Sequence, residues 1–225
     1  MNNKSDERFS EDTKLVSMKP YVELDTMLIY QGQILESSDG VNIKYGWGRA
    51  LFCNGTYYEG VWCNDKKDGF GVEIKPSGSY KIGFWKADKL HGKAKYVNLN
   101  GCVYEGDWQN GRKHGKGSEV YIDNDGKSTY LGTFKNDKKH GKGVYNCSAY
   151  EYRGEFKDGQ VTGEGKMTWT GGKKVYTGQW LNGKRHGKGL YEKKGQFTLE
   201  ADYYLNNANG NGTVKFEGKF IIYNF

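Results

Sequence analysis

The residues best suited to chemistry in this chain are four histidines, three of which directly precede a Gly-x-Gly motif and one of which precedes the variant Gly92-Lys93-Ala94. They are His91, His114, His140 and His186. A catalytic or metal-binding histidine is normally singular and has a partner placed to serve it. Four copies in one equivalent position instead predict a role in packing the turns. No Ser/His/Asp or Cys/His grouping stands out, so we predict no catalytic residue, no metal site and no cofactor.

Two short segments look like phosphate-binding loops but lack the required spacing. Residues 111–116 read Gly-Arg-Lys-His-Gly-Lys, and residues 183–188 read Gly-Lys-Arg-His-Gly-Lys. A phosphate-binding loop has four residues between its glycines, ends in Lys-Ser or Lys-Thr, and joins a strand to a helix. Only three residues intervene here, and no helix is expected. Nucleotide binding is therefore not indicated.

Basic residues cluster around the same glycines and form the best candidate for a binding surface. The candidate stripe comprises Lys67, Lys89, Lys93, Arg112, Lys113, Lys116, Lys138, Lys139, Lys142, Lys184, Arg185 and Lys188. If the repeats stack, these residues should lie along one edge of the array, where they would suit an acidic protein segment or an anionic membrane face. Solvated turns also collect lysine without binding anything, and both interpretations stay open.

These glycines recur at a nearly constant period, which is the strongest structural signal in the sequence. The first glycines of the motif, or of its Gly-x-Ala variant at Gly92, are Gly46, Gly69, Gly92, Gly115, Gly141, Gly163, Gly187 and Gly210, so the interval is 22 to 26 residues. Self-similarity at such a period is typical of a stacked repeat array. Function should therefore be sought on an extended surface.

A Tyr-x-Gly-x-Trp signature, or a variant of it, precedes most of these glycines. The last residue of the signature lies seven residues before the glycine. The predicted core consists of Tyr58, Gly60, Trp62, Gly83, Trp85, Tyr104, Gly106, Trp108, Tyr130, Gly132, Phe134, Tyr152, Gly154, Phe156, Tyr176, Gly178 and Trp180. In a strand, residues two apart point to one face. The glycine between two rings should leave a slot for a ring of the neighbouring repeat.

Turn-forming residues divide each period into a hairpin. Asn110-Gly111 and its equivalents follow the signature and accept positive φ. A second turn, such as Asn54-Gly55, follows the Gly-x-Gly motif. We expect two strands of about six residues per repeat, with the second starting near the motif. Phe216-Gly218-Phe220 is interpreted as the first strand of a final half repeat.

Composition fits a thin array held together by aromatic rings. The 225 residues include 34 Gly and only 2 Pro, and 6 Trp, 18 Tyr and 10 Phe can supply the core. Residues 1–25 are polar, lack the signature, and are predicted to form a flexible arm before an array over 26–225. No secretory or membrane-spanning segment is evident, so a cytoplasmic location is expected. The four cysteines lack metal-ligand spacing and should be isolated thiols.

On these residues the chain resembles MORN repeat proteins, with about eight repeats and a terminal half repeat. The family unit reads roughly Tyr-Glu-Gly-Glu-Trp, Asn-Gly-Lys-x-His and Gly-x-Gly, which Tyr104 to Gly117 follow closely. The resemblance implies an all-β fold: an elongated single-sheet solenoid of consecutive antiparallel hairpins. It also implies a cytoskeletal, ciliary or axonemal setting.

Three functions are compatible with this sequence. The first is a non-enzymatic scaffold that docks proteins, or its own copy, through a groove or a sheet edge; Trp47 and Trp169 lie outside the core signature and could serve it. The second is a peripheral membrane module that binds anionic phospholipids. The third is a regulatory array acting in trans on an enzyme. Nucleic acid is not favoured, because a net charge of +7 is modest and the rings follow the packing period.

Overall fold

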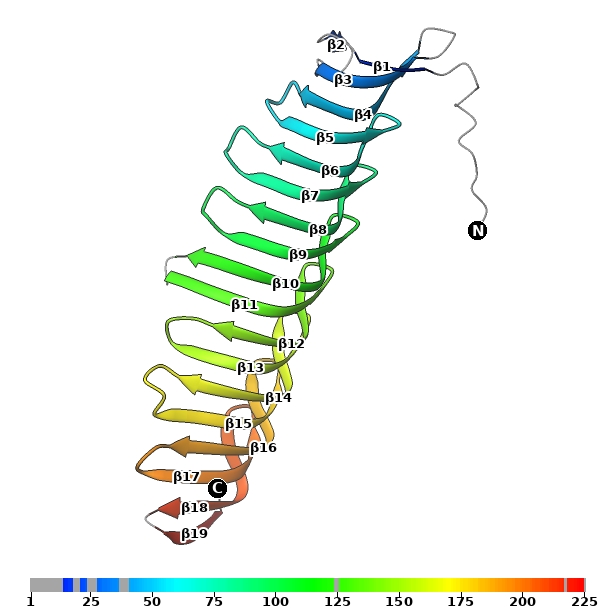
Figure 1. Ribbon diagram of the computed structural model, residues 1–225. Helices are drawn as coiled ribbons and strands as arrows, with labels where there is room; N and C mark the ends of the chain where they lie inside the picture. Colours follow the sequence, from blue (N-terminus) through cyan, green and yellow to red (C-terminus); the bar gives the residue numbers. More distant parts are fainter. Residues whose placement is uncertain are drawn as a thin grey trace, which may run out of the picture. The chain divides into compact units, whose positions relative to one another are not determined.

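The computed structural model describes residues 14–17, 21–23, 28–36, 41–123, 126–216 and 218–224. The chain divides into two compact units: Met1–Leu99 with Trp108–Arg112, and Asn100–Asp107 with Lys113–Phe225. In both units every regular element of these residues is a β-strand and none is a helix. The predicted all-β class, with consecutive antiparallel hairpins, is confirmed (Figure 1).

The strands of the first unit follow one another in chain order and pair with their neighbours. They are β1 (Lys14–Ser17), β2 (Tyr21–Glu23), β3 (Leu28–Glu36), β4 (Asn42–Leu51), β5 (Tyr57–Cys63), β6 (Lys66–Ile74), β7 (Tyr80–Lys86) and β8 (Lys89–Val97). From β3 to β8 each consecutive pair is antiparallel. β9 (Val103–Gln109) contributes residues to both units.

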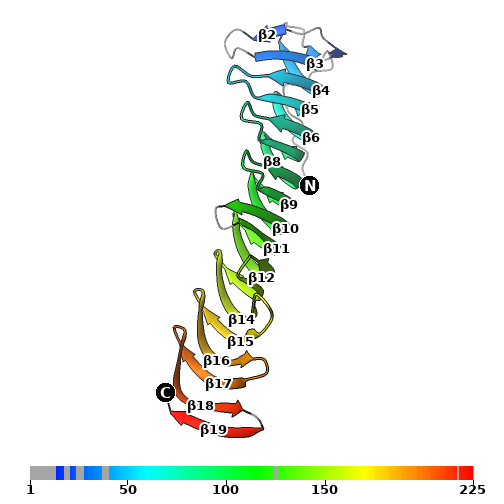
Figure 2. The ribbon, with the colours of Figure 1, turned by 90° about the vertical axis from the view of Figure 1, so that its left-hand side faces the viewer.

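The second unit repeats the same pattern. Its strands are β10 (Arg112–Asp123), β11 (Gly126–Lys135), β12 (Lys138–Asn146), β13 (Tyr150–Lys157), β14 (Gln160–Trp169), β15 (Lys174–Leu181), β16 (Lys184–Lys193), β17 (Phe197–Tyr204), β18 (Asn207–Phe216) and β19 (Lys219–Asn224). Each pairs antiparallel with the next. The hairpins are bent rather than flat (Figure 2).

The second strand of each hairpin starts earlier than predicted. β6 begins at Lys66, three residues before Gly69, and Lys66 pairs with Cys63. The cause is a two-residue turn, in which Asn64 and Asp65 have φ of 51° and 62°. The predicted length of about six residues was therefore too short, and the basic residues lie inside strands instead of in loops.

A ring does fill the slot at the glycines, but it comes from the same hairpin. An added Cβ would lie 2.7 Å from the Tyr58 hydroxyl at Gly60 and 2.3 Å from it at Gly71. The Tyr58 side chain thus lies flat along its own strand, and its hydroxyl donates to the carbonyl oxygen of Val61 at 3.1 Å. Six tyrosines make this bond: Tyr30, Tyr58, Tyr104, Tyr130, Tyr152 and Tyr176.

The tryptophans and the phenylalanines that replace them join neighbouring hairpins. Trp85 packs edge-on against Tyr58 of the preceding hairpin, with ring centroids 5.7 Å apart. Its indole N–H donates to the carbonyl oxygen of Gly71 at 3.2 Å. Phe134 and Phe156 make equivalent edge contacts in the second unit. The predicted interlocking of rings between repeats is confirmed, and these rings form the core.

A ladder of turn contacts, which we call the turn ladder, supplements the rings. The Asp88 amide donates to the carbonyl oxygen of Lys67 at 3.0 Å, and the Asp88 carboxylate accepts from the Lys67 amide at 2.9 Å. Asp65 and Asp137 repeat this two-way contact with Lys44 and Lys113. Each first turn therefore docks onto the hairpin before it.

The strands near both chain ends differ from expectation. β1 and β2 lie within the predicted flexible arm, yet both pair with β3. β1 pairs with the second half of β3, and β2 pairs with its first half. Residues 1–13, 18–20 and 24–27 lie outside the described residues, where the arm stays a prediction. The final half repeat was placed wrongly: Phe216 ends β18, and Gly218 (φ 78°) lies in the turn before β19.

Candidate protein-binding face

Each unit has two chemically distinct sheet faces. We call the side that carries Tyr58, Gly60, Trp62 and their equivalents the ring face. The opposite side, which carries Glu59, Val61 and their equivalents, is the reverse face. Strand alternation and register assign every other strand residue to one of these faces.

The twelve residues of the predicted stripe do not share one surface. Four lie on the ring face with their charged groups over tyrosine rings; with Lys44 we call them the inner cations: Lys44, Lys67, Lys113, Lys139 and Arg185. The other eight are exposed, either as the first residue of a strand or on the reverse face: Lys89, Lys93, Arg112, Lys116, Lys138, Lys142, Lys184 and Lys188. Stacking the repeats separates the two sets because side chains alternate along a strand.

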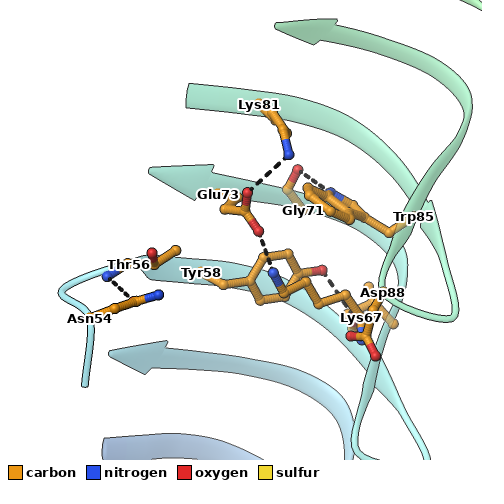
Figure 3. Close-up of polar contacts among 10 residues, drawn as sticks. Asn54, Thr56, Tyr58, Lys67, Gly71, Glu73, Lys81, Trp85 and Asp88 are labelled. Atoms are coloured by element: carbon orange, nitrogen blue, oxygen red, sulfur yellow. Dashed lines mark hydrogen bonds and ion pairs between the residues drawn. The ribbon is translucent and has the colours of Figure 1, made fainter. Parts of the chain in front are cut away.

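In the first unit the inner cations are balanced by carboxylates. The ammonium group of Lys67 lies 5.1 Å from the Tyr58 ring centroid and 4.9 Å from that of Trp85, and it pairs with the Glu73 carboxylate. Lys81 pairs with the other Glu73 oxygen at 3.3 Å (Figure 3). Burial opposes ionisation of Glu73, but the two lysines outweigh it and hold the Glu73 pKa below its usual value.

The second unit starts with a similar pair and then changes character. Lys113, over the Tyr104 ring, pairs with the buried Glu119 carboxylate, which also accepts a hydrogen bond from Tyr121. Across the described strands β11 to β18, register and alternation place no acidic residue on the ring face.

Lys139 sits in a cage of three tyrosines. Its ammonium group lies 4.3 Å from the Tyr145 ring centroid, 4.8 Å from that of Tyr121 and 5.3 Å from that of Tyr130. Burial lowers the Lys139 pKa; Glu119 opposes this shift and the charge of Lys113 adds to it. The cage stabilises the cation through the ring faces.

Arg185 is held in a comparable way without a carboxylate. Its guanidinium lies 5.6 Å from the Tyr176 ring centroid and 5.1 Å from that of Tyr203. The same group donates to the carbonyl oxygen of Asn206 at 2.7 Å. On the described ring face, neither the strands of Lys139 and Arg185 nor the strands paired with them carry a carboxylate.

A shallow hollow lies beside Arg185 on this face. Trp169 forms its floor with Tyr191, the two ring centroids being 6.2 Å apart. We call it the Trp169 hollow; it is lined by Met167, Trp169, Lys174, Trp180, Arg185 and Tyr191. Half-buried rings, a thioether and two cations together suit an apolar side chain flanked by carboxylates.

Sequence reasoning singled out Trp169 but missed the hollow and the cages. Trp47 and Trp169 both lie outside the core signature, yet they lie on opposite faces: Trp47 opposes Val61 on the reverse face, and Trp169 opposes Tyr150 on the ring face. The face of each could have been read from its distance to the marker glycine, since odd and even offsets alternate.

The histidines and cysteines show no arrangement for metal or redox chemistry. The four histidines occupy equivalent strand positions with Nδ1 buried. The structure joins no two of the four cysteines in a disulfide. Within the described residues no group of three or more His, Cys, Asp or Glu could hold a metal ion.

The sequence of the repeats matches the model of a known protein family. A model described as MORN repeat matches residues 58–80, 82–103, 104–126, 130–149, 152–174 and 176–195, more than half of the chain. This chain belongs to the MORN repeat family. A comparison with curated proteins gives no significant match.

The predicted repeats outside the matched residues keep part of the MORN packing. Tyr30 makes the same hydroxyl bond as the matched tyrosines, and Tyr203 packs edge-on against Tyr176 at 5.2 Å. A search for helices that could cross a membrane finds none in the described part of the chain.

Proposed function

We propose that this MORN protein is a non-enzymatic scaffold that binds an acidic, apolar segment of a partner protein on the ring face of its second unit. The observation that carries the proposal is the absence of carboxylates on that face across the described strands β11–β18, beside Lys139 and Arg185. A carboxylate brought there meets partly desolvated cations, where attraction is stronger than in water.

Aromatic anchoring supports the same proposal. Trp, Tyr and Arg are the residues that dominate binding energy at protein interfaces. The Trp169 hollow brings together Trp169 of one repeat and Tyr191 and Arg185 of the next. For the setting we propose a cytoplasmic cytoskeletal or ciliary assembly, which the resemblance to other MORN proteins implies.

The membrane alternative has weaker support. Lys116, Lys142 and Lys188 are exposed on the reverse face of the second unit, but Glu155, Glu164 and other acids lie between them on the same face. Interleaved opposite charges weaken the attraction to an anionic membrane.

Fluorescence titration with a defined probe tests the proposal. The probe is a twelve-residue peptide of repeating Glu-Glu-Leu-Phe, added to the full chain and to its Trp169→Ala and Arg185→Gln variants. We expect binding to the parent chain, weakened about tenfold in each variant, which corresponds to about 1.4 kcal/mol. Trp47→Ala, on the other face of the first unit, is the matched control and should bind as the parent does.

Two outcomes would contradict the proposal. One is the absence of peptide binding at low salt. The other is binding to phosphatidylserine vesicles, but not to the peptide, that Trp169→Ala leaves unchanged; this result would favour the membrane alternative.

A further inference from the structure

The reverse face of the first unit carries a patch of exposed and half-buried apolar side chains. We call it the apolar patch; it consists of Trp47, Leu51, Val61, Phe70, Val72, Ile74, Ile82 and Phe84, on β4 to β7. Trp47 is 56% exposed and Phe84 is 50% exposed. Phe70 on β6 and Phe84 on the neighbouring strand β7 are register partners, with ring centroids 5.6 Å apart. The patch is therefore a continuous sheet surface and not a scatter of single side chains.

The fold does not require an apolar surface at these positions. In the second unit, the equivalents of Phe70 are Lys116, Lys142, Glu164 and Lys188, and those of Phe84 are Asp107, Thr133, Glu155, Gln179 and Asp202. Those repeats build the same hairpins with charged or polar residues at these two positions. Some function other than folding must account for the patch.

The size of the patch suits a weak, reversible interface. Five residues on each of the four strands β4 to β7 cover about 17 Å by 19 Å, or about 330 Å² per copy. Two such surfaces face to face bury about 650 Å², below the standard range for stable complexes. A flat β-sheet face packs best against another sheet face, with the sheets about 10 Å apart.

Charge along one line of the patch identifies the partner. Register places Arg49, Glu59, Val72, Ile82 and Lys95 in one line across β4 to β8. The line reads basic, acidic, apolar, apolar, basic. When the line is turned end for end about the point between its two apolar residues, Glu59 of each copy faces Lys95 of the other, and the apolar residues meet in the middle.

We propose that the apolar patch binds a second copy of this chain. The two copies are related by a two-fold axis parallel to the strands, located between β6 and β7. This arrangement places the β6 residues Phe70 and Ile74 against the β7 residues Phe84 and Tyr80 of the second copy. A two-fold axis across the strands would instead set Glu59 against Glu59, so the charges select the first arrangement.

Sedimentation velocity of the full chain, from micromolar to near-millimolar concentration, tests the dimer. We expect a monomer–dimer equilibrium that Phe70→Asp weakens at least tenfold, because it buries a carboxylate in the apolar centre. Leu131→Asp is the matched control: Leu131 is 64% exposed on the reverse face of the second unit. It should leave the equilibrium unchanged, and circular dichroism should show both variants folded.

Charge reversal separates this dimer from any other association. Glu59→Lys and Lys95→Glu alone should each weaken it about tenfold, because both symmetric pairs then carry like charges. An equimolar mixture of the two single variants should associate as the parent does, since every pair is again opposite. The double variant should also recover.

Three results would overturn the proposal. They are a chain that stays monomeric at every concentration, a dimer that Phe70→Asp does not weaken, and a mixture of the charge variants that fails to associate. If the patch captures a different protein while the chain itself stays monomeric, the proposal is overturned by the first of these results.

Discussion

At the scale of residues, the fold depends on glycines that tyrosines cover. At Gly71 an added Cβ would lie 2.3 Å from the Tyr58 hydroxyl and 2.6 Å from the ring carbon that bears it. Gly71→Ala should therefore cost about 2 kcal/mol of the free energy of unfolding, by overpacking. Urea denaturation followed by tryptophan fluorescence measures it. Gly78→Asn, in open space at a turn, is the control and should cost less than half as much.

The pH dependence of stability follows from the same rings. Burial raises the pKa of Tyr130 and Tyr176 to about 12, against an ordinary value of about 10. The folded chain thus holds these protons more tightly than the unfolded chain does. Their stabilising contribution is complete below pH 10 and is lost as the pH rises through 12. Absorbance at 295 nm should show these tyrosines ionising late or together with unfolding. A single transition near pH 10 in a folded chain would contradict this prediction.

Lys67 and Glu73, which both lie on β6, form a buried ion pair. The lysines lower the Glu73 pKa, so the pair stabilises the fold above the usual carboxyl pKa and this stabilisation is lost as the pH falls. Glu73→Gln leaves Lys67 partly unpaired in the core and should destabilise the chain by about 2 kcal/mol at pH 7. Thermal unfolding at pH 7 and pH 3 measures this difference, which should shrink at the lower pH.

At the scale of elements, the turn ladder supplies contacts that no single hairpin contains. Asp137 accepts from the Lys113 amide at 2.8 Å, so Asp137→Gly should leave that amide without its acceptor and cost about 1 kcal/mol. Asp137→Asn keeps an acceptor oxygen and should cost less. Chemical denaturation of both variants compares them, and equal losses would mean that the carboxylate bond contributes nothing.

The sequence predicts these elements well wherever the signal is local. The two-residue turns follow from residues such as Asn110-Gly111, and the ring positions follow from a spacing of two. The turn ladder and the early start of the second strands were missed because both depend on register between hairpins. A register shift follows the signature glycine, as at Gly60, and moves Lys67 opposite Trp62. The residue types alone do not predict that register shift.

At the scale of the whole molecule, the candidate site was less predictable than the fold. The period identifies all the basic residues but treats them alike, whereas the structure divides them between two faces. Alternation along the strands explains this division, and on the ring face the charged groups of the inner cations lie over tyrosine rings. The apolar patch was missed because its residues fall between signature positions.

The two proposed surfaces should respond oppositely to salt. Peptide binding at the Trp169 hollow depends on Lys139 and Arg185 and should weaken as sodium chloride rises, because salt screens charge. Self-association through the apolar patch buries apolar side chains, which sodium sulfate favours, while the same salt screens the two Glu59–Lys95 pairs; we expect the apolar burial to dominate. Titrations of both equilibria in each salt measure the two responses. Parallel responses would mean that one surface serves both partners.

The pairing of β1 and β2 along β3 has a consequence for how the protein behaves when crowded. An array of identical hairpins is a natural seed for fibre growth, because an open strand can recruit the next chain indefinitely. Here the polypeptide occupies that side of β3 with two of its own short segments. Because that edge of β3 is already paired, a second chain cannot add a strand to it, and polymerisation at this edge is blocked.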